Sequence, residues 1–75
     1  MQKEIERRIM AKEDKIKELN LDIDNQIHNL KQLTFDEYAI EEYVIRVAEL
    51  IKEHKKEITR LQFEVYELMQ ILKSE

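Results

Sequence analysis

A chain of 75 residues without cysteine, glycine or proline is at most one small domain, and it cannot use disulfides or thiolate metal sites for support. Without glycine it also lacks phosphate-binding loops and the residue that most tight turns need, so a sheet-rich fold with several hairpins is excluded. Charged residues make up 40% of the chain while the net charge is only −4, a mixture that with periodic apolar residues is typical of long helices.

Apolar residues recur every seven positions along the chain, which places them in one seam of a helix. The first series, called a, is Ile9, Ile16, Ile23, Leu30, Val44, Ile51, Ile58, Val65 and Leu72. The second series, called d, lies four residues before each a and comprises Ile5, Leu19, Leu33, Ile40, Val47, Leu61 and Leu68, with Lys12, Gln26 and His54 as polar exceptions. The repeat predicts an all-α, coiled-coil-like fold.

The first predicted helix covers residues 2–32 and carries a narrow apolar stripe, which suits one or two neighbouring helices. Near its N-terminus a basic cluster is interleaved with glutamates and consists of Lys3, Arg7, Arg8, Lys12 and Lys15. If the chain binds nucleic acid, we expect this cluster to contact it, with a steep loss of binding as salt rises.

A turn is predicted at residues 33–35. Thr34 and Glu37 have the spacing of a capping box, and Leu33 and Tyr38 have that of a hydrophobic staple. These features predict an antiparallel two-helix hairpin within a single helical domain of residues 1–75. The alternative is one continuous helix in a parallel coiled coil, because the seven-residue frame runs unbroken past the turn. By the helical rise per residue the rod would be about 110 Å long and the hairpin about 60 Å.

The second predicted helix covers residues 35–74 and is apolar around most of its circumference between residues 38 and 51. The first helix can cover only one side of it, so we expect two hairpins to dimerise into a four-helix bundle. The predicted oligomer interface is Tyr38, Ile40, Tyr43, Val44, Val47, Ile51, Leu61 and Leu68.

The far end of the second helix carries Phe63, Tyr66 and Met69. Phe63 and Tyr66 lie off the seam, so these residues form either a second packing surface in the same oligomer or a docking surface for a different protein. Between the two apolar ends, Glu49, Glu53 and Glu57 precede Lys52, Lys56 and Arg60 by three residues, which predicts ion pairs on a solvated face.

Catalytic and metal-binding patterns are missing from the sequence. Neither His28 nor His54 has the glutamate three residues earlier that a bundle metal site uses. His54 falls at a d position, where it can fix the helix register, respond to pH or simply lie half-exposed. The chain has no paired nucleophile and base, and a helical rod offers no substrate pocket. We expect no enzyme activity, no cofactor, no metal and no small-molecule substrate.

The sequence therefore predicts a small, non-enzymatic protein–protein interaction module that acts through a self-associating helical surface. It would serve as an adaptor, scaffold or inhibitor, in a bacterial or phage accessory role. Two alternatives remain open: a dimeric hairpin that binds RNA or DNA through its basic N-terminal helix, and a structural coiled-coil spacer. We expect the cytoplasm as its compartment and no membrane contact, because the chain has no apolar run of transmembrane length and no signal-peptide core.

Overall fold

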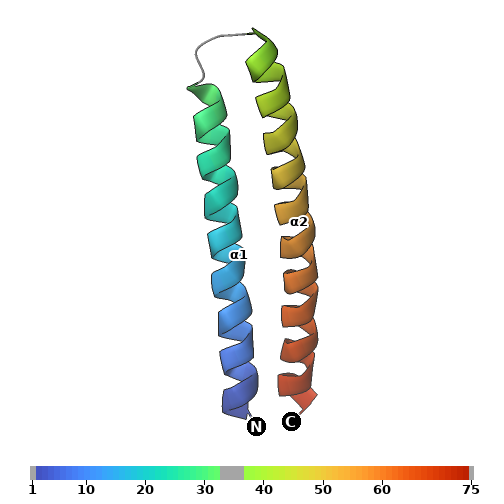
Figure 1. Cartoon of the computed structure of the whole chain (residues 1–75). Coiled ribbons are helices and arrows are strands. Elements are labelled where there is room, and N and C mark those ends of the chain that lie inside the picture. Colours follow the sequence, from blue (N-terminus) through green and yellow to red (C-terminus); the bar gives the residue numbers. More distant parts are fainter. Residues whose placement is uncertain (1, 33–36, 75) are drawn as a thin grey trace.

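The chain folds back on itself as two helices packed side by side. The computed structural model describes residues 2–32 and 37–74, and the side chains of residues 2–32 and 41–74. Helix α1 spans Gln2–Lys31 and helix α2 spans Glu37–Ser74. Figure 1 shows them running antiparallel, with the two termini at the same end. The extents of the structure, 58 × 15 × 12 Å, are those of a hairpin. The predicted all-α fold of two packed helices is confirmed, and the continuous rod is not formed.

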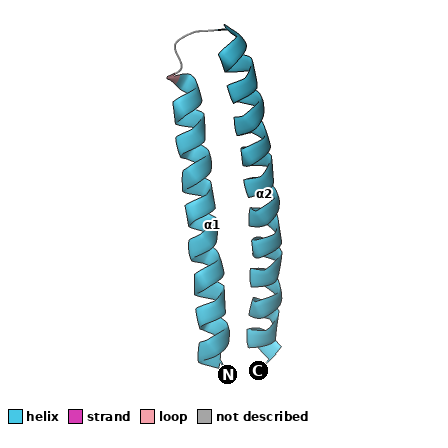
Figure 2. Cartoon of the chain, viewed as in Figure 1, coloured by secondary structure: helices cyan, strands magenta, loops and turns pink. Residues whose placement is uncertain are grey.

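Everything that Figure 2 colours as regular structure is helix, and the described residues contain no strand. Helix α1 ends in a turn in which the amide of Gln32 donates a hydrogen bond to the carbonyl of Asn29 at 3.2 Å. This bond spans three residues and satisfies a carbonyl that the end of an α-helix leaves free. The predicted turn at residues 33–35 and the capping box of Thr34 lie outside the described residues.

The core lies along the predicted seam. The buried side chains are Ile9, Leu19, Ile23, Val47, Ile58, Leu61 and Val65, and each of them occupies an a or d position. Leu19 and Ile23 from α1 form a cluster with Ile58 and Leu61 from α2. Burying such a side chain contributes about 1.5–3 kcal/mol, so these contacts hold the hairpin closed. The a and d residues of the seven-residue repeat thus pack α1 against α2 of the same chain.

Two contacts between the helices fix their register. Lys12 of α1 meets Glu64 of α2, and ten residues further along α1, Asp22 meets His54, ten residues back along α2. Each residue forward along α1 is thus matched by one residue back along α2, which places Lys31, the end of α1, opposite Ile45. Because α2 has 38 residues and α1 has 30, the first turns of α2 extend beyond α1 at the turn end (Figure 1). Val44, in this overhang, is 42% exposed, whereas Val47, one turn later, is 4% exposed.

Candidate interaction surfaces

The seam divides the rest of the hairpin into two sides. If the repeat is lettered a to g with a and d in the seam, residues at g and c flank it on one side, and residues at e and b flank it on the other. Residues at f face away from the neighbouring helix. We call the c and g residues the paired side and the b and e residues the open side, for the reasons that follow.

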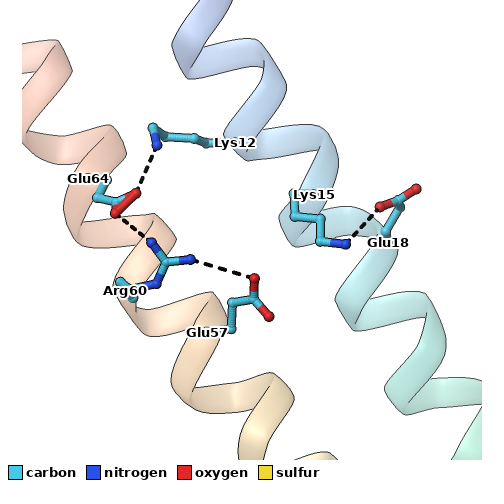
Figure 3. A network of polar contacts seen from close by, with 6 residues as sticks. All are labelled: Lys12, Lys15, Glu18, Glu57, Arg60 and Glu64. Atoms are coloured by element: carbon cyan, nitrogen blue, oxygen red, sulfur yellow. Dashed lines mark hydrogen bonds and ion pairs between the residues drawn. The ribbon is translucent and has the colours of Figure 1, made fainter.

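The paired side carries a network of ion pairs across the two helices (Figure 3). The Lys12 ammonium donates to Oε1 of Glu64 at 2.8 Å, and the Arg60 guanidinium donates to Oε2 of the same carboxylate at 2.8 Å. Arg60 also lies 3.6 Å from Glu57. The hydrogen bond from Lys12, with the positive charge of Arg60, holds the pKa of Glu64 below its ordinary value, although desolvation works against this.

His54 makes the second cross-helix contact on this side. Its Nε2 lies 2.5 Å from Oδ2 of Asp22, and its side chain is 19% exposed. The sequence placed this imidazole in the seam but did not identify Asp22 as its partner, because that assignment needs the register between the helices. Within the described residues, no third histidine or carboxylate joins the pair to form a metal-binding group.

The open side has a different character. Every b and e residue whose side chain is described is exposed, whereas the g residues Asp22, Tyr43, Glu57 and Glu64 are half-buried. The helices therefore close over these four g residues and leave the e residues outside. The other described g residues are exposed and comprise Arg8, Lys15, Asn29, Leu50 and Ile71. The exposed large apolar residues of the open side are Met10, Ile27, Ile45, Tyr66 and Met69. A shallow groove also lies along α2, lined by Ala48, Ile51, Lys52, Lys55, Lys56 and Thr59.

The residues predicted for the oligomer interface fall into three groups. Val47 and Leu61 are buried between α1 and α2, and Ile51 packs against the same core. Leu68 and Tyr43 are half-buried and Val44 is exposed; Leu68 lines a groove on the paired side. The side chains of Tyr38 and Ile40 lie outside the described residues. The structure thus brings Val47, Ile51 and Leu61 together in the seam of their own chain.

The predicted partner surface is exposed at all three of its residues. Phe63, at an f position and 62% exposed, faces away from α1, whereas Tyr66 and Met69 belong to the open side. Helix α1 adds Met10, which was not predicted because its place near Tyr66 depends on the register between the two helices. By the register of the hairpin, Met10 lies level with Tyr66, so the two helices present one aromatic and methionine-rich area near the termini.

The basic cluster of α1 is spread around the helix. Arg8 pairs with Glu4 at 3.0 Å and Lys15 pairs with Glu18 at 3.5 Å, both on the paired side. Lys12 is turned into the interface towards Glu64. The heptad places Lys3 at b and Arg7 at f, so the five residues do not form one continuous face.

Of the three ion pairs expected along α2, those of Lys56 and Arg60 are present, and that of Lys52 with Glu49, both within the described part of α2, is not formed. Lys56 lies 3.7 Å from Glu53, and Arg60 lies 3.6 Å from Glu57. Neither described helix contains a segment that is both long and apolar enough to cross a membrane. Comparisons with protein-family models, curated proteins and solved structures found no match to this chain.

Proposed function

We propose that this chain is a small protein–protein interaction module without enzymatic activity, which self-associates and presents a helical surface to another protein. The observation that carries the proposal is the open side, where apolar side chains from both helices are exposed in two groups, one near the termini and one towards the turn. We take these two groups of exposed apolar side chains as the candidate interaction site. In this proposal the chain serves as an adaptor, scaffold or inhibitor in a bacterial or phage accessory setting, and it acts in the cytoplasm.

A second copy of the chain is the first partner in this proposal. The hairpin has a thin core, because none of its described side chains is almost completely buried, and small chains of this kind gain stability by oligomerising. Two hairpins packed face to face form a four-helix bundle, whose symmetry is most commonly two-fold. In that bundle the seam residues Val47, Ile51 and Leu61 form the interior layer of each hairpin.

Mass in solution tests the self-association. Sedimentation or light scattering over a range of concentrations should give twice the chain mass of 9.2 kDa. A monomer that persists at the highest concentration would remove this part of the proposal.

Phe63 provides the test for a different protein partner. The F63S variant should lose that partner in affinity capture yet retain the mass of the self-associated wild type, because an f residue faces away from the neighbouring helix. Leu21→Ser is the matched control, since Leu21 is equally exposed at an f position of α1. Capture that is unchanged by F63S would argue against Phe63 as part of the partner surface.

The two alternatives from the sequence have less support. A nucleic-acid surface would need the basic cluster of α1 to act together, but Lys12 is engaged by Glu64 and Lys15 by Glu18. A spacer made of one continuous helix does not agree with a chain whose helices fold back on each other. Retention on RNA or DNA at low salt, lost steeply as salt rises, would restore the first alternative.

A further inference from the structure

We infer that a second copy of this chain covers the open side, related by a two-fold axis parallel to the helices, so that α1 of each copy packs on α2 of the other. The inference rests on the self-association proposed above and adds to it a face, an orientation and a register. The ion pairs, the charges and the apolar residues of the open side support it.

The ion pairs show which side lacks partners. All ion pairs of the described residues join c, d, f and g residues. Within the described chain, no b or e residue takes part in one. The charged groups of the open side, among them Asp24, Lys52 and Lys55, are thus left for an outside partner, whereas on the paired side every described charged residue except Glu67 has an ion pair within the chain.

The charges select which helix covers which. The open side of α2 carries Lys52, Lys55 and Lys73 against a single acid, Glu41. Packing α2 on a second α2 around the middle of the helix would set lysine against lysine, which costs free energy. The open side of α1 is balanced instead, with the carboxylates Glu6, Glu13 and Asp24 against Lys3, Lys17 and Lys31. A balanced face repels the lysines of α2 less than a second α2 would, so charge favours α1 on α2 over α2 on α2.

A two-fold axis parallel to the helices produces that pairing. It places α1 antiparallel to α2 of the partner subunit, at the same height as within one hairpin, so the internal register can be reused. Asp24 then lies level with the partner subunit's Lys52 and within one turn of the partner subunit's Lys55. Lys17 lies about one turn from the level of the partner subunit's Lys55 and opposes this contact in part. Near the termini, Lys3 and Glu6 both lie near the partner subunit's Lys73. The repulsion from Lys3 offsets the attraction of Glu6, so this contact contributes little.

The same register matches the apolar residues. Met10 lies level with the partner subunit's Tyr66 and within one turn of the partner subunit's Met69. Ile27 lies opposite the partner subunit's Ala48, whose small side chain allows the helices to approach closely. Apolar contacts thus occur at both ends of the interface, with charged contacts between them. Phe63, at an f position, stays on the outside and remains available to a different protein.

Charge reversal tests the pairing of α1 with α2. Asp24→Lys should weaken the dimer about tenfold, because two symmetric contacts become repulsive and each surface pair is worth up to about 1 kcal/mol. The double variant K52E/K55E should weaken it similarly. An equal mixture of the two variants should restore wild-type affinity as a mixed dimer, since both of its contacts become attractive.

Glu67→Lys, the same change of charge at a c position, is the matched control and should leave dimer affinity within twofold of wild type. All these positions are exposed, so circular dichroism should show unchanged helicity. If Glu67→Lys weakens the dimer and the open-side variants do not, the assigned face is wrong, whereas the proposed self-association stands. If the wild-type chain is a monomer throughout, the proposed self-association fails and this inference fails with it.

Cysteine cross-linking tests the register and the axis. The chain contains no cysteine, so Met10→Cys and Tyr66→Cys each introduce a single thiol. Mixed under mild oxidation, the two variants should form a disulfide-linked dimer, and either variant alone should form little. Glu67→Cys mixed with Met10→Cys should give no linked dimer. A linked dimer only from like variants, or only with Glu67→Cys, would overturn the proposed arrangement.

Discussion

The two sides of the hairpin come from the same seven-residue repeat, yet one is closed by ion pairs and the other is exposed. On the paired side, the half-buried Glu64 and Asp22 reach across to Lys12 and His54 in the seam. On the open side, the described e residues, which directly follow the d residues of the seam, are exposed on both helices. The difference teaches that satisfying a charge within the chain also fixes the rotation of a helix, and therefore decides which flank is left for a partner.

A charge placed in the seam should disrupt both sides of the hairpin, because both depend on the packing of the seam residues. Val47→Asp should lower the free energy of unfolding by about 3–5 kcal/mol, since it buries a carboxylate without a partner. Val44→Asp, in the exposed overhang of α2, should cost clearly less. Urea unfolding of both variants measures the difference. Equal losses would mean that the overhang is covered as fully as the middle of the seam.

Truncation of the core should have the next largest effect. Leu19→Ala removes a buried side chain from the central cluster and should cost about 2–5 kcal/mol. Leu21→Ala removes the same atoms from an exposed f position two residues later and should change stability by less than about 0.5 kcal/mol. Thermal unfolding at one fixed protein concentration compares the two variants. A large loss from Leu21→Ala would place that residue in an interface.

Removal of the carboxylate beside His54 tests how much the contact of Asp22 with His54 stabilises the paired side. Asp22→Ala should cost about 1 kcal/mol, because the half-buried imidazole loses its hydrogen-bond partner. Asp14→Ala, at an exposed f position of the same helix, is the control and should have little effect. Nuclear magnetic resonance of the imidazole should register the first substitution only. An unchanged imidazole spectrum in Asp22→Ala would show that the contact does not persist in solution.

Acid should weaken the paired side through Glu64, with the smallest effect of the four. Because the pKa of Glu64 is lower in the folded chain than its ordinary value, the unfolded chain takes up this proton first as the pH falls. Glu64 therefore stabilises the fold above the ordinary glutamate pKa of about 4.3, and the contribution is lost as the pH falls through the lower folded pKa.

Glu64→Gln should accordingly be less stable than wild type at pH 7, and the difference should shrink in acid. Urea unfolding at several pH values measures it, with Glu67→Gln as the exposed control. A difference that stays constant with pH would mean that the ionised carboxylate of Glu64 has no special role in the folded state.

The sequence by itself determined the helices, the seam and the polar positions within it. Periodicity is a local property of a helix, so the a and d residues could be assigned before any contact was known, and seven of them form the core. The break between the helices also had a local signal, in the residues around Thr34 and Glu37.

The tertiary structure alone decided the partner of His54, the closed and open flanks, and the end at which α2 overhangs. These depend on the register and rotation of two helices, which are set by contacts between residues 32 and 52 positions apart in the chain. A repeat of seven leaves the two flanks of a seam equivalent. The pairing of Lys12 with Glu64 and of Asp22 with His54 lies on one flank only and so distinguishes the two, and the same register places Met10 level with Tyr66.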